Sequence, residues 1–204
     1  MFDVTGVILA GGKSRRMGED KRFLTVGGVT LLDRCRSVML ENFSEVLIIT
    51  AQDNAPMDGH GGRVHQDLIP ECGSLGGLYT GLHYARHDRI FVVACDMPFV
   101  CSDMVRFFVS RDPHADIVMG RLPKGLQPLH AVYGKRALPV FERMARAGRL
   151  KIQNIASDPS LSVVVLDSVE WTGIDPSSQS FQNVNTQADL EAARALASGN
   201  SIDQ

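Results

Sequence analysis

Glycines and cations are concentrated in one short segment, residues 9–21 (LAGGKSRRMGEDK), directly after an apolar run. Glycine lets the backbone approach a ligand closely, and the amides it frees can bind phosphate oxygens. Lysine and arginine neutralise phosphate charge, arginine through two parallel hydrogen bonds. The segment therefore predicts a phosphate-binding turn. A plain basic turn at the end of a strand is the alternative.

Two common phosphate-binding motifs do not fit this segment. Gly12, Lys13 and Ser14 resemble the end of a Walker A loop, but Val7 occupies the position of that loop's first glycine. Lys13 occupies the second glycine position of the dinucleotide fingerprint. The segment therefore indicates neither a P-loop protein nor a dinucleotide-binding protein.

The elements that must position this segment alternate between strands and helices. Apolar runs predict strands over residues 4–10, 45–51, 89–95, 115–119, 129–133 and 161–166. Apolar residues at helical spacing predict helices over residues 75–87 and 136–147. Three more helices are predicted after the N-cap residues Thr30, Ser102 and Thr186.

This alternation predicts an α/β fold. We expect a single-domain, Rossmann-like three-layer sandwich, with a mostly parallel sheet and helices on both faces. Ligands in such sheets bind beyond the carboxyl ends of the strands, which places the site after Ala10, Ala51 and Cys95. The domain is expected to span residues 1–198, and the polar residues 199–204 to form a disordered tail.

Composition excludes several classes of protein. The 204 residues carry 21 Lys and Arg against 23 Asp and Glu, a formal net charge of −2, which argues against a bulk nucleic-acid binder. Apolar residues make up 44% and charged residues 22%, which is typical of a globular chain rather than a disordered one.

The cysteines and the N-terminus predict a cellular location. The four cysteines, at positions 35, 72, 95 and 101, form no Cys-x-x-Cys pair, so we expect reduced thiols rather than disulfides or a zinc site. The apolar stretch at residues 7–10 is too short for a signal peptide or a membrane span. We therefore expect a cytoplasmic protein with no membrane partner.

Four ordered segments resemble one family of enzymes. Residues 9–21 resemble the signature loop of nucleotidyltransferases that act on sugar phosphates and cofactors, and the whole set most resembles the molybdenum cofactor guanylyltransferases. The other segments are residues 67–78 (DLIPECGSLGGL), 94–99 (ACDMPF) and 181–186 (FQNVNT). Ser74 stands where the family usually has proline. The matches run from Val7 to Leu190 and so cover almost the whole chain.

The resemblance implies roles for the matching residues. Lys21, Arg15 and Asp96 would be catalytic: the two cations neutralise phosphate charge, and Asp96 holds Mg²⁺ against the phosphates. The helix that follows Gly73 would present its N-terminus to an anion. Asn183 and Asn185 would lie near the pterin and the metal, or one of them would cap the following helix. The implied nucleotide-binding set is Leu9, Ala10, Gly11, Gly12, Lys13, Lys21, Asp67, Gly76, Gly77, Asp96 and Asn185.

The implied reaction joins GMP from GTP to the terminal phosphate of molybdopterin, or of its molybdenum form, and releases pyrophosphate. The phosphate nucleophile is already ionised at neutral pH, so catalysis is expected to rest on positioning and electrostatics. The resemblance implies GTP and molybdopterin as substrates and Mg²⁺ as the cofactor. It also implies transient contact with molybdoenzymes or cofactor-assembly proteins, and no nucleic-acid partner.

Other functions stay open from the sequence. The family's base-reading asparagine has no clear counterpart, although Gln52 is a candidate substitute, so a cytidylyltransferase on the same cofactor is the nearest alternative. A sugar-phosphate nucleotidyltransferase is the next alternative. A GTP-binding cofactor carrier or a pure interaction domain would not turn over substrate. The presence of both Lys21 and Asp96 favours an enzyme over either of these.

Three further residues have open roles. Gln127 and His130 lie where the family's second half meets the pterin, so they are candidate substrate contacts. Trp171 could be a lid residue, an interface residue or a packing residue.

Overall fold

The fold is taken from a computed structural model that describes residues 2–11, 20–51 and 61–199. The predicted site residues Gly12, Lys13 and Arg15 lie outside the described residues. So do the candidate base contact Gln52 and residues 200–204 of the expected tail.

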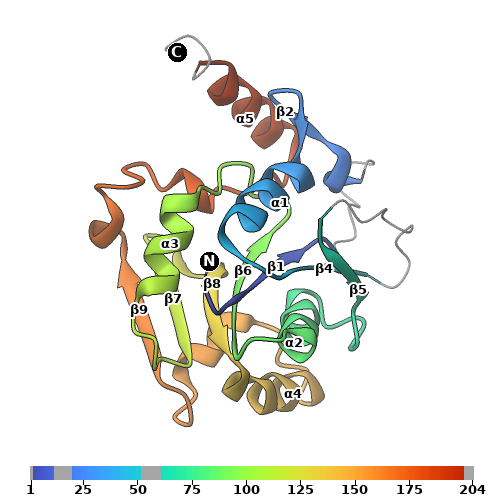
Figure 1. Cartoon of the computed structure of the whole chain (residues 1–204), viewed down its shortest axis with the longest axis vertical. Helices are drawn as coiled ribbons and strands as arrows, with labels where there is room; N and C mark the ends of the chain where they lie inside the picture. Colours follow the sequence, from blue (N-terminus) through green and yellow to red (C-terminus); the bar gives the residue numbers. More distant parts are fainter. Residues whose placement is uncertain (1, 12–19, 52–60, 200–204) are drawn as a thin grey trace.

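Seven strands of the described chain form one sheet, in the spatial order β5-β4-β1-β6-β8-β7-β9 (Figure 1). β8 runs antiparallel to its two neighbours, and every other neighbouring pair is parallel. The mostly parallel sheet is therefore confirmed. The strands are β1 (Thr5–Leu9), β4 (Val46–Thr50), β5 (Arg63–Gln66), β6 (Arg89–Ala94), β7 (Ile117–Leu122), β8 (Gly125–Gly134) and β9 (Val163–Asp167).

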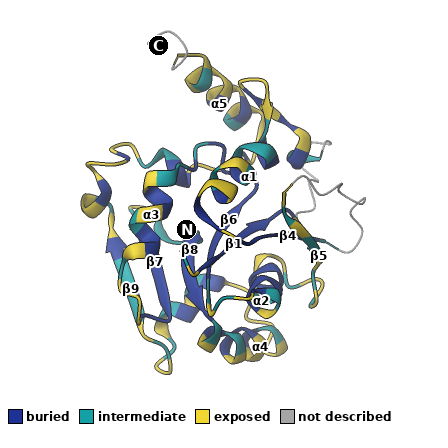
Figure 2. Cartoon of the chain, viewed as in Figure 1, coloured by how far each residue is buried: buried dark blue, intermediate teal, exposed yellow. Residues whose placement is uncertain are grey.

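Helices cover both faces of the sheet, as the three-layer prediction requires (Figure 1). α1 (Leu31–Asn42) and α3 (Ser102–Ser110) share one core with Ile8, whereas α2 (Ser74–Tyr84) and α4 (Leu138–Arg146) share the other core with Val7. Adjacent residues of β1 reach different cores because side chains alternate along a strand. Figure 2 shows these central strands buried between the two helical layers.

A third, smaller cluster of buried residues forms beside the main sheet. The short strands β2 (Thr25–Val26) and β3 (Val29–Thr30) pair with each other, and α5 (Gln187–Gly199) packs against them. Leu24, Val26, Leu31 and Leu190 lie in this cluster. The short helix η1 (Lys21–Phe23) directly precedes it. The cluster therefore joins the segment after β1 to the C-terminal helix.

Helix ends agree with the predicted caps at two of three positions. Thr30 and Thr186 each accept a bond from the backbone amide three residues later, so both N-cap predictions are confirmed. Ser102 is instead the first residue of α3, which starts after Cys101. The hydroxyl of Ser102 donates to Glu41 and accepts from Asn42, and these two bonds tie α3 to α1.

Four more short helical turns connect the main elements: η2 (Lys135–Ala137), η3 (Ile152–Ser157), η4 (Ser168–Trp171) and η5 (Gln179–Phe181). All four cysteines are free thiols, as expected. Among the described residues, none of the helices combines the length and the apolar character that a membrane span needs.

Candidate active site

A cavity of about 340 Å³ opens beyond the carboxyl ends of the neighbouring strands β1 and β6. Both strand ends line it, together with η1 and the segment before α5. The cavity thus lies where open α/β sheets bind ligands. The predicted site residues among its lining are Leu9, Ala10, Gly11, Lys21, Asp96 and Asn185.

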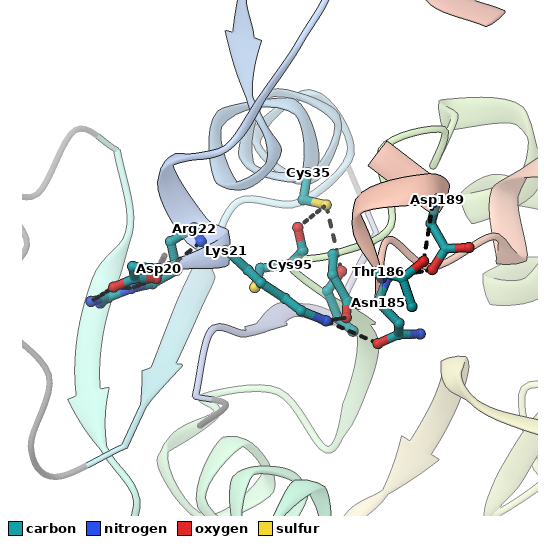
Figure 3. Close-up of polar contacts among 10 residues, drawn as sticks. Asp20, Lys21, Arg22, Cys35, Cys95, Asn185, Thr186 and Asp189 are labelled. Carbon is teal, nitrogen blue, oxygen red and sulfur yellow. Dashed lines mark hydrogen bonds and ion pairs between the residues drawn. The ribbon is translucent and has the colours of Figure 1, made fainter. Parts of the chain in front are cut away.

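Lys21 connects the two halves of the chain at this cavity. Its Nζ donates to Oδ1 of Asn185 at 2.9 Å and to Oδ2 of Asp96 at 3.3 Å. Lys21 comes from η1, Asp96 from the turn after β6, and Asn185 from the segment before α5. Figure 3 shows the side chain of Lys21 extending from η1 toward Asn185. The three groups form the charged centre of the cavity.

Asn185 is free for this contact because its neighbour caps α5. The hydroxyl of Thr186 accepts from the amide of Asp189 at 3.2 Å. The carboxylate of Asp189 accepts in return from the amides of Asn185 and Thr186, at 2.9 and 2.8 Å (Figure 3). Of the two roles that the sequence left open, capping therefore falls to Thr186, and the side chain of Asn185 points to Lys21.

The turn that carries Asp96 is held by three other segments. The first amide after β6 donates to the carbonyl of the last β1 residue at 3.0 Å. The amide of Val184 donates to the carbonyl of Asp96 at 2.8 Å. The thiol of Cys35, on α1, donates to the carbonyl of Met97 at 3.3 Å. These bonds fix the backbone from which the Asp96 carboxylate reaches the cavity.

The Asp96 carboxylate is held in a low-dielectric position. Its side chain is 18% exposed, and burial raises its pKa while the ammonium group of Lys21 opposes that rise. Oδ1 is buried and has no hydrogen-bond partner among the described residues. A buried acceptor without a partner costs about 1–3 kcal/mol, so this atom marks a position where a ligand or ion would be favourable.

This oxygen fits a magnesium ion. Mg²⁺ prefers carboxylate oxygens and commonly uses only one or two of them, with substrate phosphates and waters as its other ligands. Within the described part of the chain, no three His, Cys, Asp or Glu side chains gather into a metal site. The arrangement therefore suits an ion shared between Asp96 and a bound nucleotide better than a site built from protein ligands alone.

Sequence reasoning missed an ion pair beside Lys21. Arg22 is only 4% exposed, and its Nε donates to both carboxylate oxygens of Asp20 at 2.9 Å. These bonds lower the pKa of Asp20, which also caps η1 by accepting from the amide of Arg22. The pair fixes the turn from which Lys21 extends. The available signal was the acid Asp20 followed directly by the cations Lys21 and Arg22, which does not show which cation pairs with the acid.

Asp67, Gly76 and Gly77 lie behind the cavity wall rather than in its lining. Asp67 accepts bonds from the hydroxyl of Thr80 and from the amide of Ile69, both at 3.0 Å, and burial raises its pKa. A Cβ on Gly76 would lie 2.5 Å from the Asp67 carboxylate, and one on Gly77 would lie 3.1 Å from Leu9. The two glycines let α2 pack closely behind the site. Contact of these three residues with a nucleotide stays a prediction.

A family model described as the MobA-like NTP transferase domain matches residues 6–158, which contain η1, Asp67 and Asp96. The chain belongs to the MobA-like NTP transferase family. It is therefore a nucleotidyltransferase. A probable molybdenum cofactor guanylyltransferase of Pelotomaculum thermopropionicum is 37% identical over 197 residues, which cover 97% of this chain and 95% of that protein. A molybdenum cofactor guanylyltransferase of Desulfosudis oleivorans is 35% identical and covers 96% of each chain.

Solved structures agree on the fold. The molybdopterin-guanine dinucleotide biosynthesis protein A of Archaeoglobus fulgidus superposes with a TM-score of 0.79 at 24% identity, over 96% of this chain and 100% of that one. The 2-C-methyl-D-erythritol 4-phosphate cytidylyltransferase of Thermus thermophilus superposes with a TM-score of 0.72 at 17% identity, over 96% of this chain and 99% of that one. These similarities confirm the expected α/β architecture.

In this nucleotidyltransferase, His130 is a core residue. Its ring is fully buried. The centroid of the ring lies 5.0, 5.1 and 4.7 Å from the ring centroids of Phe91, Phe108 and Phe181. Burial lowers its pKa to about 4, so the ring is neutral at physiological pH. The candidate role of His130 as a substrate contact is therefore wrong, because a side chain buried among aromatic rings cannot reach a substrate.

The structure also settles the role of Trp171 and places Gln127. Trp171 is fully buried, and its Nε1 donates to the hydroxyl of Ser178 at 3.1 Å, so it is a packing residue. Gln127 lines two cavities next to the one described above. It therefore keeps a position from which it could contact a substrate.

Proposed function

We propose that the protein transfers GMP from GTP to the terminal phosphate of molybdopterin, with release of pyrophosphate and with Mg²⁺ as its cofactor. The observation that carries the proposal is the cluster of Lys21, Asp96 and Asn185 in the cavity beyond β1 and β6. The family membership supports nucleotidyl transfer. The names of the relatives from Pelotomaculum and Desulfosudis support the choice of guanine and of the pterin acceptor.

In the proposed reaction, an oxygen of the acceptor phosphate forms a bond to the α-phosphorus of GTP. The bond between that phosphorus and the oxygen bridging to the β-phosphate breaks, and its electron pair leaves with pyrophosphate. The nucleophile is an ionised phosphate, so no proton needs to be removed and no general base is required. The protein's task is to align two anions and to stabilise the charge that develops between them.

The residues of the cavity suit this task. The ammonium group of Lys21 offsets phosphate charge, and Asn185 holds that ammonium group in place through its 2.9 Å bond. Leu9, Ala10 and Gly11 line the cavity where a nucleotide would lie. Asp96 would hold Mg²⁺ through its unpartnered Oδ1, and the bound ion would supply Lewis-acid stabilisation at the phosphates.

The residues outside the described part of the chain complete the proposal. Gly12, Lys13 and Arg15 would contact the triphosphate, as the resemblance of residues 9–21 implies. Asp67 would support the nucleotide from behind the cavity wall. We further propose that the protein acts in the cytoplasm and hands its product on through transient contact with molybdoenzymes or cofactor-assembly proteins.

Pyrophosphate release from purified protein tests this function. The protein is incubated with molybdopterin and with GTP, CTP, ATP or UTP, in the presence of Mg²⁺ or of EDTA. We expect release with GTP that EDTA abolishes. Release with CTP instead would make the protein a cytidylyltransferase on the same acceptor. GTP binding without turnover on molybdopterin would contradict the proposal and would favour a carrier or a sugar-phosphate acceptor.

A further inference from the structure

The small third cluster of buried residues includes chain neighbours of two residues of the charged centre. Leu24 of this cluster comes three positions after Lys21, and the amide of Leu24 donates to the carbonyl of Lys21 at 3.2 Å. Val184 of the cluster comes directly before Asn185. The cluster therefore holds together two segments whose site residues are 164 positions apart in the sequence.

Asp96 is tied to the same cluster by two contacts. Phe99, three positions after Asp96, packs against the cluster. The amide of Val184, a member of the cluster, donates to the carbonyl of Asp96 at 2.8 Å. Lys21, Asp96 and Asn185 thus each lie within three positions of a residue that belongs to the cluster or packs against it. The cluster is where the three segments of the site meet.

The helices α1 and α5 hold this cluster in place through β2. Nε of Arg34, on α1, donates to the carbonyl of Val26 at 2.8 Å, and Nε of Arg194, on α5, donates to the carbonyl of Thr25 at 2.9 Å. Hydrogen bonds with a charged donor are stronger than neutral ones. Figure 1 shows α5 and β2 side by side. Because β2 begins four positions after Lys21, these bonds fix the cluster close to the site.

The third cluster is separate from the two larger cores. None of its buried residues belongs to either of the cores on the two faces of the sheet. A small region with few apolar contacts can loosen without unfolding of the whole chain. Loss of packing in this cluster would therefore shift the segments of the site before it unfolds the sheet. A displacement of about 1 Å is enough to lower a rate about 10²-fold.

We propose that Leu190 of α5 is a positioning residue for nucleotidyl transfer. By filling the third cluster it keeps η1 against the segment before α5, and so keeps the ammonium group of Lys21 where a phosphate binds. Leu190 is 2% exposed and lines neither the site cavity nor the two cavities beside it, so its effect on the reaction passes through other residues. This role rests on the proposed function in one respect, because it takes Lys21 to neutralise phosphate charge.

A double-mutant cycle between Leu190→Ala and Lys21→Met tests this role. Methionine removes the charge of Lys21 but keeps much of the length of its side chain. The cycle compares kcat/KM for GTP, from pyrophosphate release with molybdopterin and Mg²⁺, in wild type, both single variants and the double variant. Binding of GTP, CTP, ATP and UTP to the same four proteins is measured by calorimetry without an acceptor.

Leu82→Ala is the matched control. Leu82 is a fully buried leucine of α2 that belongs to a different core and lines none of the three cavities. It is combined with Lys21→Met in a second cycle. Leu190→Met, which refills the third cluster, is the rescue variant. Urea unfolding shows whether each variant is folded under the assay conditions, and Leu190→Val takes the place of Leu190→Ala if the alanine variant is not.

We expect Leu190→Ala to lower kcat/KM and nucleotide affinity about tenfold when Lys21 is present, and less than about twofold in Lys21→Met, because the group that it positions is then absent. Leu190→Val should show the same pattern with a smaller loss, and Leu190→Met should keep most of the activity. Leu82→Ala should lower the midpoint of urea unfolding but change kcat/KM by the same small factor in both backgrounds.

Two results would overturn the positioning role. An equal effect of Leu190→Ala with and without the charge of Lys21 would show a general loss of packing. A folded Leu190→Ala variant with the kcat/KM of wild type would show that the cluster does not position the site.

The binding measurements separate this role from the proposed function. If wild type shows no transfer to molybdopterin, or prefers a nucleotide other than GTP, while nucleotide binding still couples Leu190 to Lys21, the positioning role stands and the guanylyl transfer falls. If transfer from GTP proceeds without that coupling, the function stands and the positioning role falls. If wild type binds none of the four nucleotides, the positioning role falls, because Lys21 then meets no phosphate.

Discussion

Nζ of Lys21 lies 3.3 Å from Oδ2 of Asp96, although 75 positions separate the two residues in the sequence. The contact follows from the order of the sheet. β1 and β6 are parallel neighbours, so the segments that follow them emerge at the same edge. A ligand that enters the cavity therefore meets a cation and a carboxylate at once, and the second oxygen of that carboxylate still lacks a partner among the described residues.

Replacing Asp96 by asparagine should strongly reduce turnover without unfolding the protein. Asparagine keeps the shape but lacks the negative charge that would hold a metal ion, so we expect kcat to fall by about 10²-fold or more. Stability should change little, because burial already disfavours the carboxylate. Pyrophosphate release and thermal unfolding measure the two effects. The matched control is Asp88→Asn, since the Asp88 side chain is 95% exposed. Normal turnover in Asp96→Asn would remove Asp96 from the metal role.

Replacing Lys21 by alanine should slow the reaction for a different reason. The loss of one cation beside the phosphates removes charge stabilisation, which we expect to lower kcat/KM by about 10²-fold. Lys135→Ala is the control, because that lysine pairs with Asp88 and lines none of the three cavities described here. Steady-state kinetics with GTP measure the effect. A near-normal rate in Lys21→Ala would transfer the charge role to Lys13 or Arg15.

Gly76→Ala should destabilise the fold through steric clashes with residues 67 and 69. The added Cβ would lie 2.5 Å from Oδ2 of Asp67 and 2.7 Å from the carbonyl of Ile69, so α2 or the Asp67 loop must shift. Overpacking of this kind costs about 1–3 kcal/mol. Gly173→Ala is the matched control, because its Cβ meets no heavy atom within 4 Å. Urea unfolding measures both changes, and equal stability of the two variants would contradict the packing argument.

The sequence predicted the elements whose burial is nearly complete. After their first residues, Thr5 and Arg89, β1 and β6 contain no polar side chain, because both of their faces lie in cores, and such runs are visible without a structure. β5 was missed because it is an edge strand with the polar sequence RVHQ, whose residues are partly or fully exposed. β2 and β3 have two residues each, which is too few for an alternation of apolar and polar residues to be visible in the sequence.

Sequence motifs predicted the individual residues of the site, but not the ion pair that supports one of them. Lys21, Asp96 and Asn185 were found from motifs, and the structure brings them together. The pairing of Arg22 with Asp20 depends on the geometry of η1, which no spacing rule gives. His130 was predicted inside the strand 129–133 and does lie in β8, at the start of its buried half. The sequence could not show that Phe108 of α3 and Phe181 of η5 pack on its ring, because those contacts depend on the tertiary fold.

His130 should make the stability of the protein depend on pH. Its pKa is about 4 in the folded state, mainly because of burial, against about 6.5 when unfolded, and the nearby charge of Asp175 only partly offsets the effect. Between these values the unfolded chain binds a proton that the folded chain does not, so the free energy of unfolding falls as the pH drops from 6.5 to 4. A difference of about 2.5 pKa units corresponds to about 3 kcal/mol.

The variant His130→Phe isolates this contribution, because phenylalanine fits the aromatic surroundings and does not titrate. Urea unfolding of wild type and variant from pH 7.5 to 4 should show the variant gaining up to about 3 kcal/mol relative to wild type at the acidic end. His65 and the carboxyl groups titrate in both proteins, so their effects cancel in the difference. His114→Gln, which removes an exposed histidine instead of a buried one, is measured alongside as the control. A difference between wild type and His130→Phe that does not change with pH would mean that His130 binds its proton equally well in the folded and unfolded chains.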